Sequence, residues 1–79
     1  MRKRIEIHEA DDIVKINRIV SQYAYDIWIH SKSGMVDAKS LLGMFILSLK
    51  EDMFVVVEDD IDAGELFEEL KDYLAEEGS

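Results

Sequence analysis

The sequence predicts an α+β fold in which one antiparallel sheet carries all of its helices on one face. Two observations support this prediction. The hydrophobic spacing switches between the two-residue period of a strand and the 3.6-residue period of a helix, and the elements follow the order β-α-β-β-α-β-α. This order suits a two-layer sandwich, although a ferredoxin-like plan fits the periodicity almost as well. No repeat or linker divides the sequence, so we expect residues 1–79 to form one domain.

The first half of the chain alternates between strand and helix patterns. Polar and apolar residues alternate over residues 4–8, which predicts a strand with Ile5 and Ile7 on the same face. Over residues 11–23 the apolar positions recur at spacings of three and four, which predicts an amphipathic helix with an acidic first turn. Alternation returns over residues 25–30 and predicts the second strand.

The second half begins with a hairpin and a short helix. Residues 31–34 (Ser-Lys-Ser-Gly) have the composition of a turn, and residues 35–37 supply the return strand. Ser40 precedes a short apolar run and is a good N-cap for a helix. Residues 53–57 are β-branched and aromatic enough to form the fourth strand.

The last helix is expected to be acidic and solvated on its outer face. Asp62 and Glu65 form a capping-box-like pair that predicts the start of this helix. From Glu58 to residue 79 there are ten acids and one base, Lys71. The apolar stripe of the predicted helix consists of Ala63, Leu66, Phe67, Leu70, Tyr73 and Leu74.

Composition excludes several classes of protein. The chain has 9 basic and 18 acidic residues, a net charge of −9, and neither cysteine nor proline. Disulfides and thiolate chemistry are therefore excluded, and the cytoplasm is the expected location. An acidic chain is poorly suited to bind nucleic acid directly. The longest apolar stretch, residues 41–49, is far shorter than the roughly 20 residues that span a bilayer, so no membrane association is expected.

The sequence gives little indication of catalysis. His8 and His30 both fall on the polar positions of their predicted strands. A metal site would need them side by side with a third ligand, so we expect no metal and no cofactor. There is no Ser-His-Asp spacing, phosphate-binding glycine loop or His-Glu-x-x-His motif. The protein is therefore not expected to be an enzyme.

Trp28 is the first candidate contact residue. It lies on the opposite strand face from Ile27 and Ile29, where a two-layer fold has no helix to cover it. Two interpretations remain open. Trp28 either shields the strands next to it, together with Phe54 or Val56, or marks a contact for self-association.

The apolar run of the short helix is the second candidate contact. The run extends from Leu41 to Leu47 and is apolar on nearly all sides, and a short helix cannot bury every side. Some of Leu41, Leu42, Met44 and Phe45 would then face solvent or a partner, unless the whole run is packed in the core.

Residues 36–44, Val-Asp-Ala-Lys-Ser-Leu-Leu-Gly-Met, closely resemble a known motif. It is the serine-site segment, V-[ND]-[AG]-K-S-[ILV]-[ML]-G, of HPr, the histidine-containing phosphocarrier protein of the bacterial sugar phosphotransferase system. Residues 15–27 resemble the first helix and second strand of that family without a gap. The resemblance covers essentially the whole chain. It implies an open-faced β-sandwich, a four-stranded antiparallel sheet covered on one face by three helices.

The phosphohistidine motif of the family, G-[LI]-H-A-R-P, is not preserved. An alignment without gaps from Lys15 places Glu9 at the histidine, Asp11 at the arginine and Asp12 at the proline. A slip of one residue would place His8 at the histidine instead, and the arginine would still be missing. The resemblance therefore implies a divergent member, similar to the catabolite-repression HPr paralogue, which also lacks the histidine.

Ser40 matches the regulatory serine of the family. The resemblance implies that HPr kinase/phosphorylase modifies Ser40 and that the phosphorylated form binds a LacI-type catabolite regulator. It also implies docking through Leu41, Leu42 and Phe45, with Lys39 beside them. Three alternatives stay open: a serine that only caps the helix, a module that binds proteins or forms a homodimer through Trp28, and a phosphoryl carrier that uses His8.

Overall fold

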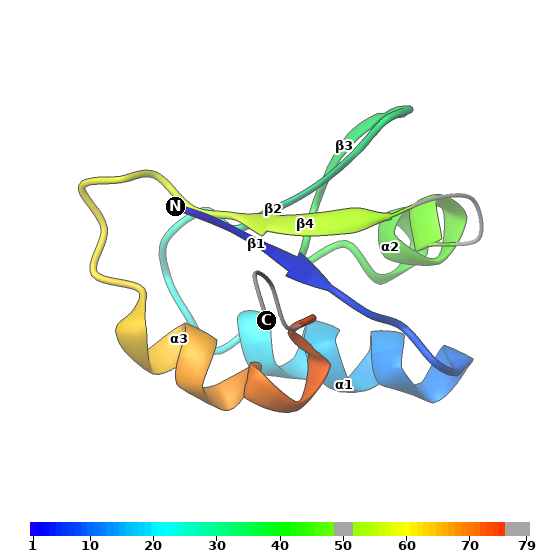
Figure 1. Cartoon of the computed structure of the whole chain (residues 1–79), viewed down its shortest axis with the longest axis horizontal. Coiled ribbons are helices and arrows are strands. Elements are labelled where there is room, and N and C mark those ends of the chain that lie inside the picture. Colours follow the sequence, from blue (N-terminus) through cyan, green and yellow to red (C-terminus); the bar gives the residue numbers. More distant parts are fainter. Residues whose placement is uncertain (49–51, 76–79) are drawn as a thin grey trace.

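The computed structural model describes residues 1–48 and 52–75, which form a four-stranded antiparallel sheet and three helices (Figure 1). The strands are β1 (Arg2–Ile5), β2 (Trp28–Ser31), β3 (Gly34–Asp37) and β4 (Met53–Val56). Their order across the sheet is β1-β4-β2-β3, and every neighbouring pair is antiparallel. The α+β fold predicted from the spacing is confirmed.

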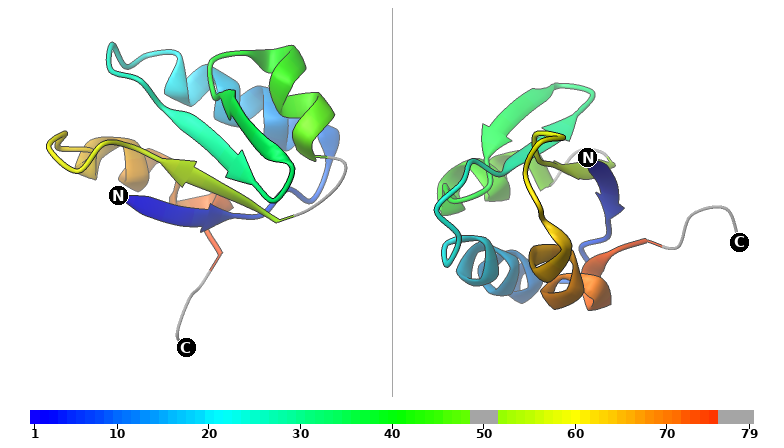
Figure 2. Two further views of the ribbon diagram at one scale, coloured as in Figure 1. Left: turned by 90° about the horizontal axis from the view of Figure 1, so that it is seen from above. Right: turned by 90° about the vertical axis from the view of Figure 1, so that its left-hand side faces the viewer.

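The helices lie on one side of the sheet and leave the other side uncovered (Figure 1, Figure 2). They are α1 (Ala10–Val20), α2 (Leu41–Ser48) and α3 (Gly64–Glu69), and α2 packs against α1 and β3. Alternate strand residues point to the helices and join one apolar core. Its largest fully buried members are Ile16, Val20, Ile27, Ile29, Met44, Val55, Val57, Leu66 and Leu70.

The first strand lies earlier in the chain than its alternation predicted. β1 spans Arg2–Ile5 because Ile5 pairs with Met53, the first residue of β4, so residues 6–8 have no β4 residue opposite them. Ile7 is nevertheless partly buried against the core, which preserves the predicted apolar side.

The final helix is shorter than predicted. α3 ends at Glu69, a 3₁₀ turn follows at Lys71–Tyr73, and Leu74 is extended (φ −80°, ψ 134°) and forms an isolated antiparallel bridge with Ile5. Two backbone hydrogen bonds flank this bridge. Glu6 N donates to Tyr73 O at 2.7 Å, and Ala75 N donates to Arg4 O at 2.9 Å. The helix stops because residues 73–75 form hydrogen bonds with the backbone of residues 4–6, at the edge of β1 that β4 does not cover.

The start of α3 also differs by one residue from the prediction. Ala63 occupies the N-cap position. Asp62, the residue before the N-cap, accepts the Gly64 N–H through its Oδ1 at 3.1 Å. The predicted pairing of Asp62 with Glu65 as a capping box is therefore wrong, although Asp62 does satisfy a first-turn amide. Glu76 and Glu77, two of the ten acids counted in the sequence, lie outside the described residues.

The uncovered side of the sheet, called here the open face, carries two rows of side chains. Within each row the residues are direct cross-strand partners from β1, β4, β2 and β3. The first row is Arg2, Val56, Trp28 and Asp37, and the second is Arg4, Phe54, His30 and Met35. Trp28 therefore shares the outer face with Val56 and Phe54, as its alternation with Ile27 and Ile29 predicted.

Across the two described stretches of chain, none of the helices has the length and apolar content to cross a membrane.

Candidate functional site

Ser40 lies directly before α2 and caps its first turn. Its hydroxyl oxygen accepts the Gly43 N–H at 3.3 Å, and its carbonyl accepts the Met44 N–H at 3.0 Å. The first hydrogen bond joins an N-cap side chain to the amide three residues later, the geometry that Ser provides at helix starts. The side chain is also exposed. Ser40 is thus both a structural cap and an accessible hydroxyl.

Gly43 gives the Ser40 hydroxyl its space. A Cβ at position 43 would lie 3.1 Å from Ser40 Oγ and 3.3 Å from Val36 Cβ. Both separations are shorter than ordinary van der Waals contact. A larger residue at position 43 would therefore crowd both the Ser40 hydroxyl and the Val36 side chain of β3.

The loop before α2 is held by three polar contacts. Asp37 Oδ1 accepts the Lys39 N–H at 2.9 Å, and Asp37 O accepts the Ser40 N–H at 2.9 Å. The Lys39 ammonium donates to the Tyr25 carbonyl at 3.0 Å in a partly buried position. Lys39, expected from the resemblance to lie beside a docked partner, therefore connects this loop to the segment before β2.

The outer side of α2 exposes apolar side chains. Leu42 is 72% exposed, Ile46 is 58% exposed and Leu41 is 38% exposed. These three residues are called here the α2 surface. Phe45, by contrast, is partly buried and packs against the core, as Met44 and Leu47 do more completely. Sequence reasoning missed Ile46, although its spacing of four from Leu42 places both on one helix face.

The start of α1 is the segment that aligns with the phosphohistidine motif of the family. Glu9 is the N-cap, with extended backbone angles (φ −150°, ψ 163°). Asp12, in the first turn, accepts the backbone N–H of His8 at 3.0 Å and of Glu9 at 3.3 Å through one carboxylate oxygen. The Asp12 carboxylate therefore accepts hydrogen bonds from the two backbone amides that precede the helix.

His8 lies between two carboxylates. Its Nε2 is 3.6 Å from Glu6 Oε2, and its Nδ1 is 3.9 Å from Asp12 Oδ2. The imidazole is 73% exposed. The other first-turn acid, Asp11, pairs with Lys15 at 3.2 Å, and this contact raises the pKa of the Lys15 ammonium.

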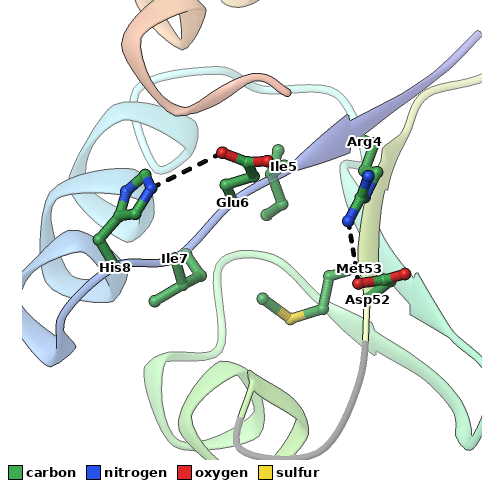
Figure 3. A pocket seen from close by; sticks show the side chains of 7 residues that line it. All are labelled: Arg4, Ile5, Glu6, Ile7, His8, Asp52 and Met53. Carbon is green, nitrogen blue, oxygen red and sulfur yellow. Dashed lines mark hydrogen bonds and ion pairs between the residues drawn. The ribbon is translucent and has the colours of Figure 1, made fainter. Parts of the chain in front are cut away.

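An open pocket of about 300 Å³ lies beside His8 (Figure 3). Its apolar floor consists of Ile5, Ile7 and Met53. Its polar side chains lie in pairs, His8 beside Glu6 and Arg4 with Asp52 at 3.1 Å. The lining contains more carboxylates than guanidinium groups, so a phosphoryl group on His8 would enter a field of like charge.

Other candidate chemistry is not supported by the positions of the residues. His8 follows β1 and His30 lies in β2, in the second row of the open face. Within residues 1–48 and 52–75, no group of three His, Cys, Asp or Glu side chains is placed to hold a metal ion.

Comparison with known proteins gives one match. The family model described as "PTS HPr component phosphorylation site" matches residues 6–76, which include both Ser40 and the start of α1. The comparisons with curated proteins and with solved structures gave no significant match.

Proposed function

The chain belongs to the HPr family of the bacterial sugar phosphotransferase system, and we propose that it acts there as a regulatory protein switched by phosphorylation of Ser40. The observation that carries this proposal is the exposed Ser40 hydroxyl at the N-terminus of α2. The proposed role is one of interaction and not of catalysis.

The electrostatics of α2 favour a phosphate on Ser40. A phosphoserine carries a charge of about −1.5 to −2 and would lie against the amides at the positive end of the helix. Gly43 has no side chain to obstruct it. The modification would thus replace one weak cap with a stronger one and add negative charge beside an apolar surface.

The start of α1 supports the same assignment by contrast. The positions that align with the family's histidine, arginine and proline are Glu9, Asp11 and Asp12, and all three are acidic. A phosphoryl group there would need a cation to stabilise it, but the carboxylates of Glu6 and Asp12 lie 3.6 Å and 3.9 Å from the His8 imidazole. The Lys15 ammonium is already paired with Asp11. We therefore propose that neither Glu9 nor His8 carries phosphoryl groups.

The proposed partners dock on α2. HPr kinase/phosphorylase would reach the exposed Ser40, and a LacI-type catabolite regulator would bind the phosphorylated form through Leu41, Leu42 and Phe45. Lys39 contributes by holding the preceding loop against the Tyr25 carbonyl. With these partners, the proposed location of the protein is the cytoplasm.

Radiolabelling tests the proposal. Purified protein is incubated with labelled ATP and HPr kinase/phosphorylase, and label is expected on the wild type but not on Ser40→Ala. Ser31→Ala is the matched control, since Ser31 Oγ also accepts a nearby amide, from Ser33 at 3.2 Å, but lies in a hairpin. An unlabelled wild type, or label that persists in Ser40→Ala, would overturn the proposal.

A further inference from the structure

The open face has a largely apolar centre that also contains His30, with Arg2 and Arg4 along its β1 edge and Asp37 at its β3 edge. Trp28, Phe54 and Val56 are partly buried in its centre. Arg2 lies over the Phe54 ring, with its guanidinium carbon 3.9 Å from the ring centroid. Stacking of this kind leaves the N–H edges of the guanidinium free to pair with a carboxylate.

The first row of the open face is self-complementary. It begins with the cation Arg2, continues through Val56 and Trp28, and ends with the exposed anion Asp37. A two-fold axis parallel to the strands, between β4 and β2, reverses this order in a second copy. Arg2 then lies opposite Asp37 of the second copy, and Val56 lies opposite Trp28.

We propose that the open face is a docking site for a second copy of this chain, packed sheet on sheet about this two-fold axis. The same patch serves both copies, as in an isologous dimer. Sheets packed in this way lie about 10 Å apart, which suits the side chains of two inner faces. No residue of α2 takes part in the contact, although Asp37 also holds the loop before Ser40.

The charge distribution favours this arrangement over other self-contacts. The acids that give the chain its charge of −9 are concentrated after residue 57. Glu65, Glu68, Glu69 and Asp72 are exposed and belong to the helical layer, which lies on the other side of the sheet from the open face (Figure 2). Packing through the open faces therefore places the two acidic layers as far apart as a dimer allows, which minimises their repulsion.

The area of the face limits the strength of the dimer. A standard interface buries about 800 Å² on each partner, which is roughly a sixth of the 5071 Å² surface of this chain. Four strands of four residues span only about 19 by 13 Å. We therefore expect a weak dimer, with a Kd on the order of 100 µM.

A charge exchange between Arg2 and Asp37 tests the geometry. Sedimentation equilibrium from about 10 µM to 1 mM brackets that Kd and should show a monomer–dimer equilibrium for the wild type. Arg2→Asp and Asp37→Arg should each weaken it at least tenfold, and the double variant should restore it. Restoration also rules out misfolding as the cause. A wild type that stays monomeric at 1 mM, or a double variant no better than the singles, overturns the proposal.

Two control variants separate this contact from others. Glu65→Arg changes the net charge as much as Asp37→Arg does, but on the helical layer, and should leave the dimer intact. Leu42→Glu, on the α2 surface, should do the same. The single tryptophan of the chain provides a second readout, since Trp28 emission should shift to the blue as the protein concentration rises. Loss of the dimer in Leu42→Glu would assign the contact to α2 and overturn the proposal.

Discussion

The hydroxyl oxygen of Ser40 lies 3.3 Å from the backbone nitrogen of Gly43, across the first turn of α2. The same oxygen is the atom that a kinase would modify. The helix cap and the proposed modification therefore use the same atom, and substitutions at Ser40 can separate the two roles.

Ser40→Ala should lower the free energy of unfolding by about 1 kcal/mol, because the Gly43 amide loses its acceptor. Ser40→Asp should cost less, since its carboxylate can also cap the helix and interacts favourably with the helix dipole. Urea unfolding followed by circular dichroism measures both. Equal losses for the two variants would show that the cap contributes little.

Leu42→Glu should abolish binding of the phosphorylated protein to its regulator and change stability by less than about 0.5 kcal/mol, because the side chain is 72% exposed. Met35→Glu is the matched control. It is 59% exposed, but on the open face, so it should bind the regulator normally. Calorimetric titration of the regulator measures the binding. If Leu42→Glu fails to fold, the Leu42 side chain contributes to the core and not to partner binding.

Asp12→Ala should destabilise the protein by about 1–2 kcal/mol, because the His8 and Glu9 amides lose their shared acceptor at the start of α1. Asp12→Asn should cost less because it keeps a carbonyl acceptor. Hydrogen exchange at these two amides is the direct measurement, and both should exchange faster in Asp12→Ala. Unchanged protection would show that water satisfies them equally well.

Incubation with phosphoenolpyruvate and Enzyme I should leave the protein without acid-labile phosphate. The reason is electrostatic: His8 lies between Glu6 and Asp12, and no arginine occupies the aligned position at Asp11. An authentic HPr in the same reaction shows that Enzyme I is active. Acid-labile phosphate on the wild type that disappears in His8→Ala would contradict the prediction.

Stability should fall at alkaline pH through Tyr23. Its hydroxyl donates to Glu69, and this hydrogen bond, together with desolvation, raises its pKa far above the ordinary value of 10.0. A raised folded-state pKa contributes stability that is fully present below pH 10 and is lost as the pH rises through the folded value. Urea unfolding from pH 8 to 11 should therefore show a smaller alkaline loss in Tyr23→Phe. Identical slopes for the two proteins would contradict this.

Local patterns predicted which elements form, and tertiary contacts decided where they end. The alternation around Trp28 places it on the open face because strand period alone fixes the face of a side chain. The apolar stripe, in contrast, continues through Tyr73 and Leu74 in the sequence. In the structure α3 ends at Glu69, and Leu74 is extended and pairs with Ile5. No periodicity within residues 62–74 carries information about a free strand edge some seventy positions earlier.

The candidate site shows the same division. The Ser40 cap was predictable because it depends on residues within one turn. The contact of Lys39 with the Tyr25 carbonyl was not, because it joins two loops that only the folded chain brings together. Ile46 was within reach of sequence reasoning through its spacing from Leu42, and it belongs with Leu41 and Leu42 on the α2 surface.

The bridge between Ile5 and Leu74 also constrains how the protein folds during synthesis. β1 is made early, but both of its neighbours, β4 and the segment around Leu74, are made more than forty residues later. The backbone N–H and C=O groups of β1 therefore stay hydrogen-bonded to water until then, whereas the hairpin of β2 and β3 can form earlier. A ribosome-bound chain that stops before residue 73 would lack one side of this strand, so full native protection of β1 should appear only after the segment around Leu74 has been made.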